Sequence, residues 1–251
     1  MTEKQASRMD ATKWLVVAMA VVIVALLAVL SQQQAAQKAG SSAPAPAPSA
    51  STPATSTADP EAEAARTEFL LSLPRREASD PLAKGDVDAP VVLTEWADYR
   101  CPYCSVWAEE TLPGLQPLID DGTLRVEFRD LAIFGDESIK AATAARAAGE
   151  QSAYFAFQHA LFAALPNQGH PDIPDDLVYG IVTDLGLDLD QFTKDWADPT
   201  HAAAVKADTA EAQQLGLSST PAFVIGTEFV AGAQPLKVFQ QIIAEQAALH
   251  S

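Results

Sequence analysis

Residues 91–104 read VVLTEWADYRCPYC, and this stretch decides the fold that we expect. Val91–Trp96 is a short apolar run rich in β-branched residues and follows Ala89-Pro90, so it predicts a buried strand. Two cysteines come next, in Cys101-Pro102-Tyr103-Cys104. Proline is favoured at the first position of a helix, so the pattern predicts a helix from Pro102 to about Ile119. The cysteine pair therefore lies between a strand and a helix.

Strand and helix patterns alternate on both sides of this stretch. Their order predicts β-α-β, a block of helices of roughly 65–75 residues, and then β-β-α, which is an α/β fold with a helical insertion at about residues 136–205. The expected helices are 61–73, a long helical region at about 137–164, 175–185, 189–196, 201–215 and 236–250; the other expected strands are 123–128, 222–225 and 228–231.

The position of Cys101 predicts an unusually acidic thiol. With Pro102 as the first helical residue, Cys101 is the N-cap, and its sulfur can accept the amide hydrogens of Tyr103 or Cys104. The helix dipole adds positive potential at the same place. Both effects favour the thiolate, so we expect Cys101 to be the reactive sulfur. Cys104 lies one turn later on the same face, deeper, and suits a resolving thiol.

A structural disulfide and a zinc site are the alternatives for this cysteine pair. A four-residue loop gives only about 2 kcal/mol of chain entropy, against about 3 kcal/mol for fifteen residues, so a bond here adds little stability. A zinc site would need two more ligands from the four histidines, which show no paired spacing: His159, His170, His201 and His250. We therefore expect redox chemistry and no metal, with the Cys101–Cys104 disulfide as the only redox group and no other cofactor.

Glu95 lies six residues before Cys101, inside the apolar strand. A buried carboxyl group has a raised pKa. Beneath a buried thiol, Glu95 can accept the proton of Cys104 as that sulfur attacks. The alternative is a solvated glutamate at a sheet edge.

The segment Ser219-Thr220-Pro221-Ala222-Phe223 precedes the next-to-last expected strand, and proline at the start of a strand marks a boundary. A cis Thr220–Pro221 bond would hold backbone polar groups of Thr220 open for an extended peptide. Physical reasoning from the residues leaves both cis and trans open.

Other conspicuous aromatic residues predict ordinary core packing. Trp96 and Trp107 flank the cysteine motif, and a second group recurs at helical spacing within one expected helix. That group is Tyr154, Phe155, Phe157, Leu161 and Phe162.

The N-terminus predicts a membrane anchor. Residues 14–30 form an unbroken apolar run of 17 residues, preceded by Lys4, Arg8 and Lys13. This length is at the lower limit for spanning a bilayer, and the basic flank predicts a cytoplasmic segment 1–13. A cleaved signal peptide and a buried core helix are the alternatives. Residues 31–60 are rich in Ala, Pro and Ser without large apolar side chains, which predicts a disordered linker to a domain at 61–251.

The charge of the chain argues against nucleic acid as a partner. It has 16 Lys+Arg and 33 Asp+Glu, a formal net charge of −17. Residues 1–60 hold four bases and three acids, so the acidic excess lies in the remaining domain. A body this acidic repels phosphate backbones.

Taken together, EWADYRCPYC, the order of elements and STPAFVIGTEF resemble the DsbA-like thioredoxin-fold thiol–disulfide oxidoreductases of bacteria, especially membrane-anchored members. The resemblance spans about residues 80–250. It implies that Cys101 is the nucleophile, Cys104 resolves, Glu95 relays protons, and a cis-proline loop at Thr220 and Pro221 contacts substrate. Pro102 and Tyr103, between the cysteines, are also candidate substrate contacts. Strong oxidants of the family carry Pro-His there, and this chain has Pro-Tyr.

The resemblance implies an extracytoplasmic enzyme that oxidises cysteine pairs in unfolded exported proteins. It would be a monomer on a single-pass anchor, with a membrane reoxidant of the DsbB-like or vitamin K epoxide reductase-like type. A reductase or isomerase of the same fold is one alternative, because the motif does not set the direction of exchange. A tethered peptide-binding chaperone without turnover is the other.

Overall fold

The computed structural model describes residues 59–249. The expected cytoplasmic segment 1–13, the anchor 14–30 and nearly all of the linker 31–60 lie outside the described residues. Within 59–249, no helix has the length and apolar character needed to cross a bilayer. The first described helix is α2 (Pro60–Leu71), close to its expected bounds, and it begins where Asp59 caps the amide of Glu61.

A five-stranded mixed sheet forms the centre of the domain, in the order β1-β3-β2-β4-β5. Its strands are β1 (Ala83–Lys84), β2 (Val91–Ala97), β3 (Leu124–Asp130), β4 (Ala222–Ile225) and β5 (Glu228–Ala231). β2 and β3 run parallel, while β1 pairs with β3, β4 with β2 and β5 with β4 in antiparallel fashion. Sequence analysis missed β1, because a two-residue strand has no periodicity to detect.

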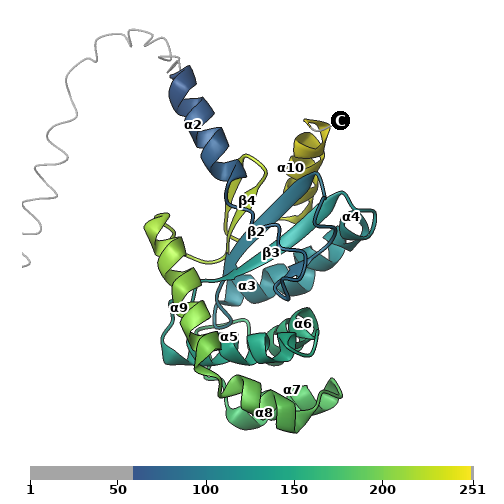
Figure 1. Cartoon of the computed structure of the whole chain (residues 1–251), viewed down its shortest axis with the longest axis vertical. Helices are drawn as coiled ribbons and strands as arrows, with labels where there is room; N and C mark the ends of the chain where they lie inside the picture. Colours follow the sequence, from purple (N-terminus) through teal and green to yellow (C-terminus); the bar gives the residue numbers. More distant parts are fainter. Residues whose placement is uncertain (1–58, 250–251) are drawn as a thin grey trace, which may run out of the picture. The chain divides into compact units, whose positions relative to one another are not determined.

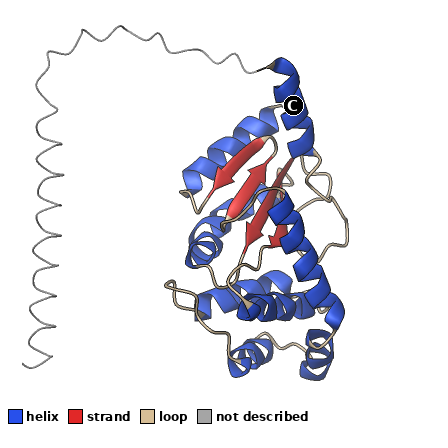
Figure 2. Ribbon diagram, turned by 90° about the vertical axis from the view of Figure 1, so that its left-hand side faces the viewer, coloured by secondary structure: helices blue, strands red, loops and turns tan. Residues whose placement is uncertain are grey.

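Helices cover both faces of this sheet. α10 (Leu236–Ala248) packs on β2 and β4, and α4 (Gln116–Asp120) packs on β3. On the other face, α9 (Pro199–Gln214) packs on β3, and Leu70 of α2 joins a smaller apolar cluster with Trp96 and Val224. Figure 2 shows the strands between these helices. Because side chains alternate along a strand, residues 93, 95 and 97 of β2 face the main core and 94 and 96 face the other side.

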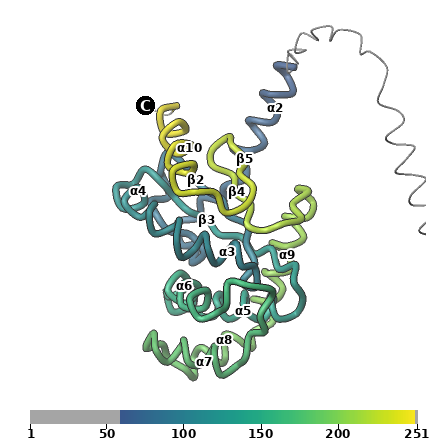
Figure 3. The backbone as a smooth tube through the Cα atoms, turned by 180° about the vertical axis from the view of Figure 1, so that it is seen from behind, coloured from purple at the N-terminus to yellow at the C-terminus, as the bar shows by residue number. Residues whose placement is uncertain are grey.

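The chain between β3 and β4 is entirely helical apart from its turns. It holds α5 (Asp136–Gly149), α6 (Tyr154–Ala164), α7 (Asp175–Asp184), α8 (Leu189–Trp196) and α9, and so continues beyond the expected end near residue 205. Figures 1 and 3 both show α5 to α8 gathered at one end of the sheet, with α9 leading back beside it. The aromatic group of α6 is core, as expected: Tyr154, Phe157, Leu161 and Phe162 are buried.

The prediction of a single helix from Pro102 to about Ile119 was wrong. The segment is α3 (Pro102–Val106), a π-helical stretch (Trp107–Thr111), a 3₁₀ turn (Leu112–Leu115) and then α4. Pro113 and Pro117 lack the amide hydrogen that an α-helix needs in its interior, so they break the regular ladder.

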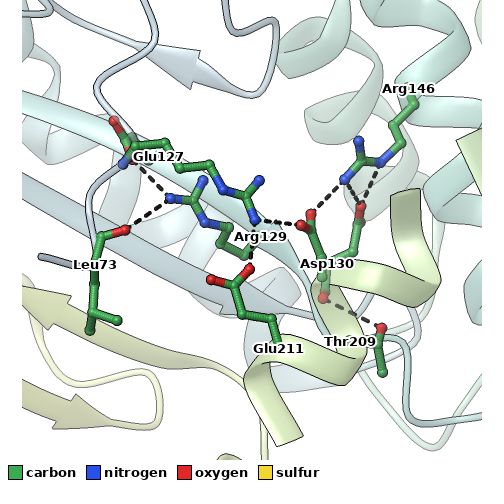
Figure 4. A network of polar contacts seen from close by, with 9 residues as sticks. Leu73, Glu127, Arg129, Asp130, Arg146, Thr209 and Glu211 are labelled. Carbon is green, nitrogen blue, oxygen red and sulfur yellow. Dashed lines mark hydrogen bonds and ion pairs between the residues drawn. The ribbon is translucent and has the colours of Figure 1, made fainter. Parts of the chain in front are cut away.

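A network of ion pairs ties the segment before β1 to β3 and α9, and Figure 4 shows part of it. Arg146 of α5 reaches both Asp130 and Asp208, at 2.7 and 2.6 Å. Arg75 reaches Asp208 at 2.6 Å, and the guanidinium of Arg129 donates to the Leu73 carbonyl. The network fixes the start of the domain against the face of the sheet that lies away from the cysteines.

Candidate active site

The turn from β2 into α3 is held by Asp98, which is buried. Its Oδ1 accepts the amide of Arg100 at 2.8 Å, and its carbonyl accepts the amide of Cys101 at 3.1 Å. Its Oδ2 accepts the amides of Ile133 and Phe134, at 2.7 and 3.2 Å. One carboxylate therefore joins the turn before the cysteines to the chain after β3. Sequence analysis did not single out Asp98, although an aspartate two residues before an amide it can cap is a turn signal.

Cys101 is the N-cap of α3, with Pro102 as the first helical residue, as expected. Both cysteines are free thiols; Cys101 is 4% exposed and Cys104 is fully buried. The pKa of Cys101 is lowered to about 6. The largest cause is the hydrogen bond from the Cys104 side chain; burial opposes it, and the Thr220 side chain and the amides of Cys104 and Tyr103 also favour the thiolate.

The cause of this acidity differs from the one expected. The sulfur of Cys101 forms no N-cap hydrogen bond, and the Cys101 carbonyl accepts the Cys104 amide at 3.1 Å. The helix amides therefore act on the sulfur without capping it, and the neighbouring thiol acts most strongly. The pKa of Cys104 moves the opposite way, well above its usual range, because of burial and then because of Cys101. One sulfur is held as a thiolate and the other as a thiol.

Glu95 is buried in β2, 2% exposed, on the face that looks toward the main core. Burial raises its pKa to about 8, while the indole of Trp107 and the ammonium of Lys84 favour its ionised form without offsetting burial. Glu95 in turn contributes to the raised pKa of Cys104. At neutral pH the Glu95 carboxyl group therefore keeps its proton.

The Thr220–Pro221 bond is cis. The Cys101 thiol lies 3.3 Å from the Thr220 carbonyl oxygen, so the loop before β4 meets the cysteine motif although 119 residues separate them in the chain. Thr220 Oγ1 is buried and meets no group among residues 59–249 in hydrogen-bond geometry, although the Thr220 side chain favours the Cys101 thiolate. Between the cysteines, Pro102 is partly buried and Tyr103 is 65% exposed, which leaves its ring open to a bound chain.

Two further residues, Trp107 and Lys84, act on the site although neither was predicted to belong to it. Trp107 is fully buried, as expected of a core residue, but its indole also favours the ionised form of Glu95. Lys84 comes from the missed strand β1; its ammonium lies 5.0 Å from the centre of the Phe155 ring, in a pocket of about 350 Å³. Burial lowers the pKa of Lys84. Its approach to Glu95 depends on the sheet order, which no local pattern indicates.

Comparison with known proteins agrees with this geometry. Over 146 residues the chain is 27% identical to a probable disulfide bond formation protein D of Bacillus anthracis, a match that covers 56% of this chain and 67% of that protein. It is 34% identical over 145 residues to a Na(+)/H(+) antiporter NhaA 1 of Salinispora arenicola, covering 57% of this chain but only 21% of the antiporter. The chain thus spans about a fifth of the antiporter's length.

Among solved structures, a thioredoxin-like oxidoreductase from Silicibacter pomeroyi is 30% identical, with a TM-score of 0.57. The match covers 72% of this chain and 97% of the other. The thioredoxin family model itself matches residues 77–245, which include the cysteine motif, Glu95, the helical insertion and the Thr220–Pro221 loop. On this match and this arrangement, the chain belongs to the thioredoxin family, among its DsbA-like members.

Proposed function

We propose that the chain is a thiol–disulfide oxidoreductase that works in the oxidising direction on cysteine pairs of unfolded exported proteins. The lowered pKa of Cys101 carries this proposal. A thiolate held in the folded, reduced protein stabilises that reduced form, and a stabilised reduced form makes the disulfide a better oxidant. This stabilisation is complete above the usual thiol pKa of 9.0 and is lost as the pH falls through about 6.

In the proposed reaction, a client thiolate attacks the sulfur of Cys101 in the oxidised enzyme. The bond between the two enzyme sulfurs breaks, Cys104 leaves with the electron pair, and Glu95 gives it a proton. A second client thiolate then attacks the client sulfur of the mixed disulfide, and Cys101 leaves as its stabilised thiolate. The client gains a disulfide and the enzyme gains two electrons. Cys101 and Cys104 carry these electrons themselves.

The surroundings of the motif suit an extended client chain. Thr220 and Pro221 lie beside the Cys101 sulfur, and Tyr103 is exposed next to it. We place the enzyme outside the cytoplasm, on an anchor formed by residues 14–30, where a DsbB-like or vitamin K epoxide reductase-like membrane protein would reoxidise it. The apolar run and its basic flank support this placement.

Replacing Cys104 by serine tests the catalytic role directly. In Cys104→Ser the Cys101 thiolate can still attack a client disulfide, which is the reverse of the last step above, forming a mixed disulfide and releasing one client thiolate. Cys104 is then missing and cannot displace the client from Cys101, so clients should accumulate covalently on Cys101, detected as reducible adducts by non-reducing electrophoresis and mass spectrometry. Cys101→Ser is the matched control and should form none. A peptide-binding chaperone without turnover would give no adduct with either variant, and that result would refute the enzyme proposal.

The reduction potential of the Cys101–Cys104 pair tests the direction of exchange. Equilibration with glutathione should give a value nearer about −120 mV than about −270 mV, the range spanned by strong oxidants and thioredoxin-like reductants. A value near the lower end would assign the chain to disulfide reduction.

A further inference from the structure

A loop of the helical insertion, residues 166–174, contacts the residues that flank the cysteine motif on both sides. The loop joins α6 to α7. Before the motif it meets Arg100, and after the motif it meets Ser105, whose Oγ lies 2.5 Å from Asn167 Oδ1. Ser105 Oγ also lies 2.6 Å from Glu109 Oε1. The four motif residues are therefore bracketed by one segment that is distant in the sequence.

Arg100 makes the larger of these two contacts. Its side chain is 13% exposed and donates to the carbonyls of Pro171, at 2.7 Å, His170, at 2.5 Å, and Phe134. It also lies 3.4 Å from Asp172. A planar guanidinium has five N–H donors in a fixed fork, so it alone among cationic side chains can hold several carbonyls in one plane.

The loop returns a hydrogen bond to Arg100. His170 Nδ1 lies 3.0 Å from the Arg100 carbonyl oxygen, and since that oxygen can only accept, Nδ1 carries the hydrogen. The His170 ring stacks on Phe134, with ring centres 3.7 Å apart, which fixes its plane. The Arg100 carbonyl belongs to the peptide group whose nitrogen is Cys101, so this contact reaches the backbone of the nucleophile.

The other end of the loop is anchored in the helical insertion. Ile173 is fully buried; its amide donates to Glu137 at 2.8 Å and its carbonyl accepts from Lys140 at 2.5 Å. Both partners belong to α5. The loop is therefore a fixed connection from α5 to the residue before Cys101, and not a free surface segment.

We propose that Arg100 and His170 form a positioning clamp, which holds the Arg100–Cys101 peptide group in one orientation. In this orientation the Cys101 sulfur points toward the donors that stabilise its thiolate. Every polar group of Arg100 is engaged: its amide by Asp98, its side chain by the loop, and its carbonyl by His170. Those donors, the Cys104 thiol and the amides of Tyr103 and Cys104, favour the Cys101 thiolate, and their effect weakens as the sulfur rotates away from them. The clamp rests on the proposed function, in which the Cys101 thiolate is the reacting group.

A pair of substitutions at His170 tests the clamp in the full-length reduced chain. His170→Ala removes the donor, whereas His170→Asn places an amide N–H where Nδ1 stood. The rate of Cys101 alkylation by iodoacetamide, followed by mass spectrometry from pH 5 to 9, reports its thiolate fraction. With His170→Ala the midpoint should move up and the rate at pH 6 should fall by about two- to fivefold. His170→Asn should restore most of the rate.

The controls separate the clamp from folding and from the proposed function. His201→Ala, at an imidazole 3.9 Å from Glu150, should leave the alkylation profile unchanged. If His170→Ala lowers the unfolding midpoint but not the alkylation rate, the loop only supports the fold and the clamp is refuted. If the unsubstituted chain itself alkylates with a midpoint near 9, the proposed function fails, whatever the variants do.

Discussion

Strands β2 and β3 lie side by side in the sheet, and each carries one buried glutamate, Glu95 on β2 and Glu127 on β3. They occupy neighbouring positions in the register, since Glu95 lies opposite Phe128 and Thr94 lies opposite Glu127. Their side chains therefore point to opposite faces of the sheet. Both residues are almost without solvent exposure, at 2% and 0%, yet the pKa values of their carboxyl groups move in opposite directions.

Glu127 is surrounded by hydrogen-bond donors. Its Oε1 accepts from Arg125 Nε at 2.9 Å and from the Arg76 amide at 2.8 Å. Its Oε2 accepts from the Arg75 amide at 2.8 Å and from Arg129 Nη2 at 3.1 Å. Figure 4 shows Glu127 and Arg129 together with the ion pairs of Arg146. Burial alone would raise the pKa of Glu127, but these donors outweigh it and the pKa is lowered.

Glu95 has no comparable set of donors, so burial decides its state. Leu93 and Ala97 precede and follow Glu95 on its own face of β2. On the opposite face of the sheet, by contrast, β3 presents Arg125 and Arg129 on either side of Glu127. The contrast teaches that low solvent exposure does not by itself set the charge of a carboxyl group, because the donors around the group can outweigh burial. One glutamate is an anion at neutral pH and the other keeps its proton.

The largest expected effect on stability follows from removing the negative charge of Glu127. Glu127→Gln should lower the free energy of unfolding by about 3–5 kcal/mol at pH 7, because it leaves buried arginines without their partner and turns an N–H toward other N–H donors. Urea unfolding followed by circular dichroism measures this. Glu228→Gln, at an exposed residue of β5, is the control and should change little. Equal effects at the two positions would show that the donors around Glu127 contribute nothing.

Glu95→Gln should instead raise the free energy of unfolding. In the unfolded chain Glu95 ionises above its usual pKa of 4.5, while in the folded protein it keeps its proton up to about 8. The folded state therefore loses stability as the pH rises from 4.5 to 8, and Glu95→Gln escapes this loss. The variant should gain a few kcal/mol of stability over the parent through this effect at pH 8, and less than about 1 kcal/mol at pH 5.

Urea unfolding of the oxidised proteins at pH 5, 6.5 and 8 tests this window, since neither thiol titrates in that form. Parallel stability profiles for the parent and Glu95→Gln would contradict a raised pKa. The gain in stability should come with a loss of rate, because an amide cannot give Cys104 its proton. Formation of the mixed disulfide should slow by about 10²-fold or more.

Sequence patterns were sufficient for the parts of the site whose determinants are local. The strand before the motif, Cys101 at the start of a helix, the buried Glu95 and the boundary at Pro221 each depend on neighbours within a few residues. β3 also places residues 125, 127 and 129 on one face, but no ion pair was predicted for these arginines, and the expected strand ended at residue 128.

What sequence patterns missed depends on contacts between distant segments. The charge of Lys84 acts on Glu95 only because β1 joins the sheet beside β3, and His170 contacts Arg100 only because a loop of the insertion reaches back to the motif. The cause of the Cys101 acidity was missed for a different reason. The spacing of the motif placed the sulfur near the helix amides, but it did not indicate that a neighbouring thiol would act more strongly than those amides.

The smallest expected effect concerns Lys84, whose ammonium favours the ionised form of Glu95. Lys84→Gln keeps the length of the chain but removes the charge, so the pKa of Glu95 should rise further above 8, by less than about one unit, since the partly solvated ammonium is screened. The difference in free energy of unfolding between a protein with Glu95 and its Glu95→Gln variant stops growing near the pKa of Glu95. In the Lys84→Gln background this pH should be higher by that amount. Lys237→Gln, an exposed lysine of α10, should leave it in place. In the Glu95→Gln background, Lys84→Gln should have no pH-dependent effect, and any that persisted would mean that Lys84 acts on another group.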